Sequence, residues 1–580
     1  MIRTTTRQPA WQSLLLAGVA ALALGACSGE AGKTDASKPA DTAQASNVVQ
    51  TDAGPVQAVE RNGMRNWFAI PYAAPPVGAL RWTPPSPAAH WTTPLANTAS
   101  GSPCLQTSNS PFRSKGDSED CLYLDVHAPA SGAGPFPVMV WIHGGAFLTG
   151  ASGDYADPSP LVSKGVIVVA MNYRMGAMGF LGDPSLAAED GSVGDYGIMD
   201  QQAALRWVKT NIAAFGGDAN NVTIFGESAG GFSVLTHLAS PLSAGLFNKA
   251  IVESGAYGVN GQLTRDELEA KSRTAAEAAV KAAGADAGAA CAGDKITADC
   301  LRGLPEAVVR DHLLTAFTTA VPSVIPSVDG KVLPQTIKAT FDAGAENKVP
   351  VINGSNEDEY RLFLAISEMG ARAAKSPPDT DPADKSFLMS PAIYAMSAKR
   401  LAGQAGVPAK TLTEKDYPLS AYGDDKSLQP SFASAAAATD SIFSCNGLNV
   451  SKKIAQEGSP VWMYEFRNQS APPIVGVVDG KYQLALPQGA AHASEIPFVM
   501  NMTDLQTPEN KDLQTAMSQY WVNFARTGDP NGEGVPEWPG FAKGSVQALD
   551  VASGGGVTSL DAAAFADQHK CGSVWSKLTF

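Results

Sequence analysis

The segment that most constrains the fold is 221–231, which reads NVTIFGESAGG. Its first part, 222–225, is a short apolar run rich in β-branched residues, which is typical of a buried strand. The following GESAG turns sharply into small residues that can continue as a helix. This pattern predicts a nucleophile elbow, in which Ser228 sits at a strained apex with its hydroxyl exposed. The flanking glycines leave room for the neighbouring strand and helix.

A Gly-Ser turn without chemistry is the alternative, because a chain with 56 glycines can contain such a motif by chance. The context favours the elbow. Strand-like runs alternate with helical spacing along the chain, and this alternation predicts an α/β fold with a mostly parallel central sheet flanked by helices. The expected strands are 122–126, 138–142, 166–170, 222–225, 249–253 and 349–352, and the expected helices include 200–211 and 514–526.

Other segments fit around this sheet. The proline-punctuated run 66–73 predicts an edge strand that leads into a loop. Residues 263–345 and 367–441 are rich in alanine, helical in composition and poorly patterned. We expect both to be helical insertions that form a pocket or lid above the sheet.

The first 26 residues predict an export signal. Arg3 and Arg7 precede the short apolar run 14–24, which is too short to span a bilayer. The run ends in LGAC, which resembles a bacterial lipobox and implies cleavage before Cys27 and lipidation of that residue. Ser28 after it resembles an outer-membrane lipoprotein. An ordinary secretory signal with an incidental cysteine is the alternative.

This N-terminus predicts export to a bacterial cell envelope, with a lipid anchor as the membrane attachment. Residues 27–50 carry almost no large apolar side chains, so we expect a flexible tether there. The remaining 51–580 are expected to be one α/β domain. The formal net charge of −14 argues against nucleic acid and against a basic membrane-binding face.

Six cysteines remain after Cys27, an even number in a chain expected to be exported, which favours disulfides. Short loops suggest the bridges Cys104–Cys121 and Cys291–Cys300, which leaves Cys445 to pair with Cys571. The sequence contains no C-x-x-C pair and no histidine cluster, so it does not suggest a metal site. We therefore expect neither a metal nor a cofactor.

A serine nucleophile needs a base and an acid that orients the base, in the chain order Ser, Asp or Glu, His. His492 lies in the small-residue loop GAAHASE, from which an imidazole can reach a neighbouring site, and it is our candidate base. His237 is expected to be structural, and His312 and His569 are expected on the surface. For the acid, the strand 349–352 leads into NGSNEDE, where Glu357, Asp358 and Glu359 are all candidates.

An oxyanion hole needs amides that converge on one point. The segment 143–146 follows a central strand and resembles the H-G-G-G type that accompanies G-x-S-x-G. A plain Gly-Gly turn is the alternative. The amide of Ala229, at the start of the helix after Ser228, points to the place where an oxyanion would form.

With these motifs, the chain resembles the type-B carboxylesterases, the α/β-hydrolase family that includes bacterial para-nitrobenzyl-type esterases and cholinesterases. The resemblance runs from about Asn66 to Trp575. Besides the elbow, it rests on the motifs IPYA at 70–73, SEDCLYL at 118–124, NYR at 172–174, FGGD at 215–218 and NFARTGDPN at 523–531.

The resemblance implies a serine esterase with the triad Ser228, Glu359 and His492. Its G-x-N-x-D-E-G pattern falls on 354–360, with Tyr360 in place of the last glycine. The implied oxyanion donors are Gly145, Ala146 and Ala229, where Ala146 replaces a third glycine. Glu227 and Ser254 are implied beside the catalytic pair. The family's disulfide spacing also matches the three bridges.

The expected reaction is ester hydrolysis through an acyl-enzyme, by a monomer acting on small ester substrates. The loop 105–120 lacks the tryptophan with which cholinesterases stack on a quaternary ammonium and holds only Phe112, so choline esters are not expected as substrates. Lipase-like, lactone or amide hydrolysis on the same fold is one alternative. A catalytically inactive, esterase-like binding protein is the other.

Overall fold

An eleven-stranded sheet runs through the part of the chain that the structure describes, a computed structural model covering residues 47–107, 112–293, 295–376, 378–478 and 480–577. The strand order is β15-β14-β11-β10-β9-β8-β6-β7-β5-β4-β3. Strands from β14 to β7 run parallel, and antiparallel strands complete both edges. The bounds are β3 Val59–Arg61, β4 Met64–Pro71, β5 Tyr123–Pro129, β6 Phe136–Ile142, β7 Ile167–Met171, β8 Gly217–Glu227, β9 Lys249–Glu253, β10 Val351–Asn356, β11 Val461–Phe466, β14 Ser545–Leu549 and β15 Thr558–Asp561.

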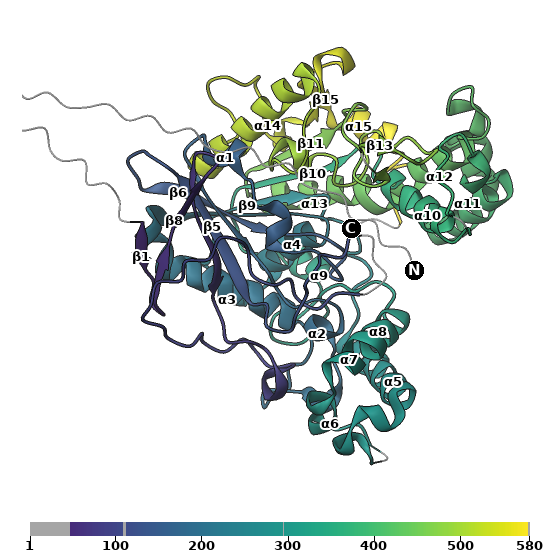
Figure 1. Cartoon of the computed structure of the whole chain (residues 1–580). Helices are drawn as coiled ribbons and strands as arrows, with labels where there is room; N and C mark the ends of the chain where they lie inside the picture. The colour runs from purple at the N-terminus through teal and green to yellow at the C-terminus, as the bar shows by residue number, and fades with distance from the viewer. Residues whose placement is uncertain (1–46, 108–111, 294, 377, 479, 578–580) are drawn as a thin grey trace, which may run out of the picture. The chain divides into compact units, whose positions relative to one another are not determined.

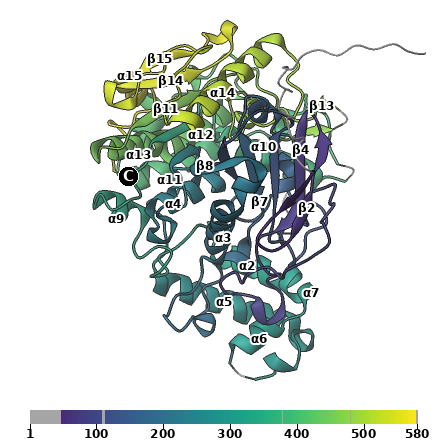
Figure 2. The same ribbon diagram turned by 90° about the vertical axis from the view of Figure 1, so that its left-hand side faces the viewer.

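Helices cover both faces of the sheet (Figures 1 and 2). Because successive strand side chains point to opposite faces, Val140 packs into one hydrophobic cluster and its neighbour Trp141 into the other. Helices α3 (Tyr196–Asn211) and α4 (Ala229–Ala239) contribute to the first cluster, and α1 (Ser159–Val162) and α14 (Pro508–Thr527) to the second. The predicted mostly parallel α/β sheet is thereby confirmed.

Two groups of helices occur where insertions are predicted. Figure 1 shows α5–α8 and α10–α12 at two separate places around the sheet. Their bounds are α5 Arg265–Ala283, α6 Ala298–Gly303, α7 Glu306–Val308, α8 Leu314–Ala320, α9 Ile337–Asp342, α10 Arg361–Ala373, α11 Pro391–Ala405, α12 Gln429–Thr439 and α13 Cys445–Gln456. The remaining helices are α2 Gly176–Phe180 and α15 Ala562–Gln568.

Two predictions at the N-terminal side of the domain are wrong in detail. The tether was expected to reach residue 50, but β1 (Val48–Gln50) pairs with β2 (Pro55–Gln57), since the β-branched pair Val48-Val49 suits a strand. The run 66–73 was expected at a sheet edge, but β4 pairs on both sides and β3 is the edge. The signal, Cys27 and most of the tether lie outside the described residues.

All three predicted disulfides are present. Cys104 bonds to Cys121, Cys291 to Cys300, and Cys445 to Cys571, with Cα–Cα distances of 4.9, 4.6 and 5.2 Å. The last bridge ties the start of α13 to the segment after α15. Among the described residues, no helix is both long enough and apolar enough to cross a membrane.

Candidate active site

The backbone around Ser228 has the geometry of the predicted elbow. Strand β8 ends at Glu227, Ser228 has φ 56° and ψ −119°, and α4 starts at Ala229. A Cβ at Gly226 or Gly230 would lie 2.5 or 1.9 Å from the carbonyl oxygen of Ile142 in β6. Only glycine fits at these two positions, because the turn is pressed against the neighbouring strand. Ser228 is 9% exposed, which is less than the sequence pattern suggested.

The structure brings Glu359 and His492 into direct contact. His492 Nδ1 lies 2.5 Å from Glu359 Oε2. The other carboxylate oxygen accepts hydrogen bonds from the Ser254 hydroxyl at 2.6 Å and from the Asn356 amide at 2.8 Å. Three donors therefore hold a fully buried carboxylate, which in turn fixes the imidazole ring.

The two neighbouring acids have other partners. Glu357 pairs with Arg467 at 2.8 Å, and Asp358 pairs with Arg361 at 2.8 Å. Both candidates are therefore half-buried in ion pairs with arginines and do not contact His492 in a hydrogen bond or ion pair among the described residues. Tyr360, which replaces the expected glycine, donates its amide to Thr439 at 3.0 Å, so the loop is anchored at this departure from the pattern.

The other ring nitrogen of His492 is open. Within the described residues Nε2 makes no hydrogen bond, and the hydroxyl of Ser228 is not paired with it. Its near neighbour is Glu227 Oε1, at 3.1 Å. Such contacts between a serine and its base are often loose in the absence of substrate.

Buried carboxyls crowd this imidazole. Burial alone lowers the pKa of His492, but the carboxylates of Glu227 and Glu359 outweigh it and bring the pKa to about 9. Burial raises the pKa of Glu227 well above the usual carboxyl range, against the pull of His492. Burial also raises the pKa of Glu253 to about 8 and that of Glu495 to about 7. Protons are therefore shared among these groups near neutral pH.

Sequence reasoning missed Glu253 and Glu495. Glu253 ends β9 and accepts a hydrogen bond from the Trp521 indole at 2.9 Å. Glu495 accepts one from the Asn356 side chain at 2.5 Å. Their positions directly before Ser254 and three residues after His492 could have marked them as candidates.

The segment after β6 lies against the serine. A Cβ at Gly144 would be 3.2 Å from the Ser228 Cβ, and one at Gly145 would be 2.1 Å from the Thr149 carbonyl oxygen. Gly145 and Ala146 both have positive φ, 101° and 57°. This left-handed backbone is costly for Ala146, which is typical of segments held for function.

The residue that opens this segment is fixed and neutral. The His143 ring stacks on Tyr173 with centroids 4.4 Å apart, and Nδ1 lies 2.9 Å from the Gly144 carbonyl oxygen. Burial lowers the pKa of His143 to about 4. His143 therefore supports the loop and adds no charge to the site.

Aromatic rings surround the imidazole. The rings of Phe363 in α10 and Phe443 in the helical turn η12 (Asp440–Ser444) lie 5.2 and 5.0 Å from the His492 ring. Tyr257 packs on Phe443 at 5.8 Å and on Phe232 of α4 at 5.5 Å. Phe363 and Phe443 lie just outside the two ends of the predicted insertion 367–441, so the wall at His492 is built from the segments that flank this insertion.

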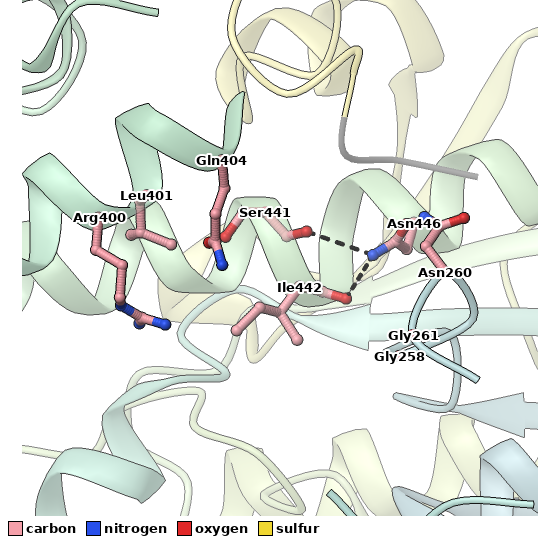
Figure 3. A pocket seen from close by; sticks show the side chains of 9 residues that line it. All are labelled: Gly258, Asn260, Gly261, Arg400, Leu401, Gln404, Ser441, Ile442 and Asn446. Atoms are coloured by element: carbon pink, nitrogen blue, oxygen red, sulfur yellow. Dashed lines mark hydrogen bonds between the residues drawn. The ribbon is translucent and has the colours of Figure 1, made fainter. Parts of the chain in front are cut away.

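A cavity of about 430 Å³ is lined by residues that are next in sequence to this wall (Figure 3). It is lined by Gly258, which follows Tyr257, and by Ile442, which precedes Phe443. Asn446 donates to the Ser441 and Ile442 carbonyl oxygens at 3.3 and 2.9 Å, and these bonds hold the turn between cavity and wall. Leu401 of α11 also lines the cavity and lies away from Asn446 in Figure 3.

Of the predictions for two other histidines, the structure confirms one and contradicts the other. His237 is buried between Ser243 and Gln201, each at 2.9 Å, so its structural assignment is confirmed. The surface assignment of His569 is wrong. Its ring is buried, with Nδ1 2.5 Å from Asp440 and Nε2 2.7 Å from Glu465. These partners lie more than a hundred residues away in sequence, and composition cannot reveal them.

Known proteins share this sequence and fold. The chain is 34% identical to a para-nitrobenzyl esterase of Bacillus subtilis (strain 168), over 85% of this chain and 92% of that protein. It is 32% identical to a human cocaine esterase, over 83% of this chain and 82% of that protein. A solved PNB esterase structure superposes with a TM-score of 0.68 at 32% identity, over 90% of this chain and 99% of that one.

The match also holds at the level of the whole domain. The profile of the Carboxylesterase family covers residues 45–566, which is nearly all of the described chain. With the α/β-hydrolase fold and the elbow in place, the reaction class follows from the family. The chain belongs to the carboxylesterase family, and it is a carboxylic-ester hydrolase.

Proposed function

We propose that this esterase works through the triad Ser228, His492 and Glu359. The observation that carries the proposal is the contact of 2.5 Å between Glu359 and His492, beside a serine on a strained elbow. Glu359 holds the imidazole so that Nδ1 faces the carboxylate and Nε2 remains open for the serine proton. Ser254 supports this pair through its hydrogen bond to Glu359.

The reaction proceeds in two steps. Ser228 Oγ attacks the ester carbonyl carbon while its proton passes to His492 Nε2, and the alcohol then leaves with that proton. Water, deprotonated by His492, hydrolyses the acyl-enzyme and restores the serine. In both steps the amides of Gly145, Ala146 and Ala229 hold the oxyanion. Losing one such donor typically costs about 2.7–4 kcal/mol of transition-state stabilisation.

We expect small uncharged esters as substrates. The aromatic side chains of Phe363 and Phe443 lie around His492, and the loop after Cys104 lacks the tryptophan that favours choline. Esters like those named for the relatives, such as para-nitrobenzyl esters, are suitable probes. Long-chain lipids and lactones are the second candidate class on this fold.

The test is hydrolysis of p-nitrophenyl esters from acetate to palmitate by the purified protein and by Ser228→Ala. We expect short-chain activity that falls by about 10⁶ in the variant. Ser163→Ala removes an exposed serine and serves as the control. A Ser228→Ala enzyme of near-normal rate refutes the triad. No activity of the folded parent on any ester points to a narrow substrate or a binding role, and a preference for long chains at lipid interfaces points to a lipase.

The N-terminal sequence supports a location for the enzyme. We infer that it is an exported bacterial lipoprotein anchored through Cys27, since LGAC follows a short apolar run. Labelled palmitate should enter the parent chain and not Cys27→Ser, and only the parent should partition into detergent. Equal behaviour of the two chains would favour an ordinary secretory signal.

A further inference from the structure

The cavity of about 430 Å³ in Figure 3 has an uneven charge balance. Three segments line it: the loop after β9, the helix α11, and the turn η12 with the start of α13. The chain has 56 acidic and 42 basic residues, yet the described residues that line this cavity include no aspartate or glutamate. Arg400 alone among them is charged. The cavity is therefore a positive site in an acidic protein.

Two side chains of α11 offer hydrogen-bond donors to the cavity. Arg400 and Gln404 are four residues apart, so they lie on the same face of the helix. Neither side chain makes a hydrogen bond or ion pair with the described residues, and both are exposed, so a solute can reach them. In Figure 3 their polar ends leave α11 in the same direction, toward the level of Ile442. A guanidinium and an amide thus present several N–H groups together.

Other polar side chains of the cavity are used within the fold. Asn446 donates to the carbonyl oxygens of Ser441 and Ile442, and the Ser441 hydroxyl donates to the Ala438 carbonyl oxygen at 3.3 Å. These bonds hold the turn that forms one wall. Leu401, which is buried, and Ile442 add apolar surface. An occupant should therefore combine a negative group with a small apolar body.

A carboxylate matches this lining better than a phosphate. The planar fork of a guanidinium can pair with both oxygens of a carboxylate. A phosphate group carries up to two charges, whereas Arg400 is the one cation among the described lining residues. The apolar wall suits the hydrocarbon part of an organic acid. Hydrolysis of a carboxylic ester releases an acid of this kind.

We propose that this cavity binds small organic carboxylates, with Arg400 paired to the carboxylate and Gln404 donating to it. The site is distinct from the triad, because Ser228, Glu359 and His492 do not line the cavity. The proposal therefore stands or falls separately from the catalytic assignment. The acid that the enzyme releases and an acid made elsewhere offer the same chemistry to Arg400.

The test is isothermal titration calorimetry of the purified protein with butyrate, and with butyramide as its uncharged counterpart. We expect saturable binding of butyrate at one site that depends on Arg400. Butyramide should bind at least about tenfold more weakly, since hydrogen bonds to a charged group carry most of the affinity. Arg400→Gln should weaken butyrate binding by a similar factor, and Arg400→Lys, which keeps the charge but not the fork, should fall between Arg400→Gln and the parent.

Lys399→Gln is the matched control, because it removes the same charge from the neighbouring exposed position of α11, which does not line the cavity. It should bind butyrate as the parent does. Equal affinity of the parent and Arg400→Gln, equal affinity for butyrate and butyramide, or no saturable binding overturns the proposal. Succinate separates the two sources: binding of butyrate supports the released acid as the ligand, and binding of succinate alone supports an acid made elsewhere.

Discussion

Two buried histidines in this chain have similar charged surroundings but differ in how their ring nitrogens are hydrogen-bonded. His492 lies between Glu359 and Glu227, and His569 lies between Asp440 and Glu465. Both are raised in pKa by these carboxylates against the effect of burial, to about 9 and about 10. A histidine between two acids is therefore not by itself a catalytic feature.

The difference lies in what each ring nitrogen binds. Both nitrogens of His569 make hydrogen bonds, and Asp440 accepts a further one from the Tyr417 hydroxyl at 2.7 Å. His492 has one nitrogen committed to Glu359 and one without a hydrogen bond in the described chain. A saturated imidazole links elements of the fold, whereas an open one next to a serine can move a proton.

The sharpest separation of the two sites is by activity. His492→Ala removes the proposed base, so we expect kcat on p-nitrophenyl acetate to fall by about 10⁶ while the melting temperature changes little. His569→Gln should keep kcat within about tenfold per folded molecule. The measurement is turnover normalised to folded protein by circular dichroism. A comparable loss of turnover in both variants would remove the distinction.

The effects on stability should follow the reverse order, with the larger loss on substitution of His569. The folded pKa of His569 lies above its unfolded value of about 6.5, so its stabilising effect is complete below that pH and is lost as pH rises through about 10. Removing one partner of a buried ion pair costs about 3–5 kcal/mol. We therefore expect His569→Gln to lower the free energy of unfolding by about that amount at pH 6, and by less at pH 10.

Urea denaturation at both pH values measures this effect. His312→Gln is the control, since that histidine is only half-buried in the helical insertion. An equal loss of stability at pH 6 and pH 10 would show that the charge on His569 contributes nothing.

The smallest effect concerns the carboxylate on the open side of His492. Glu227→Gln keeps the shape of the side chain but removes the charge that raises the pKa of His492. The neutral base then forms at lower pH, so the acid limb of kcat/KM should shift down by about one pH unit. Glu357→Gln, which alters the ion pair with Arg467, is the control. An unmoved limb would mean that Glu227 holds a proton throughout.

The sequence was most informative where structure is local. The elbow at Ser228 and the strands β6, β8 and β9 were predicted within a few residues, because apolar runs and glycines determine them directly. The disulfides were predicted from loop length. The choice of Glu359 over Glu357 and Asp358 depended on the family resemblance, since all three are carboxylic acids in the same loop.

Long-range contacts were not predictable in this way. The partners of His569 come from η12 and β11, and β11 itself was not recognised as a strand. The open state of His492 Nε2 beside Glu227 depends on side-chain packing between segments that lie far apart in the sequence. The hydrophobic periodicity of the sequence carries no information about contacts between side chains from distant segments.

The origin of the wall residues has a consequence for how this enzyme could change over time. Ser228, Glu359 and His492 are held by turns and loops at the sheet, whereas Phe363 and Phe443 lie in helical segments at the two ends of the insertion 367–441. Gly226 and Gly230 admit no other residue, because a Cβ at either position would collide with the Ile142 carbonyl oxygen. Selection for a new ester can therefore exchange the rings around His492 and inherit the proposed triad unaltered, so one scaffold can give rise to many specificities.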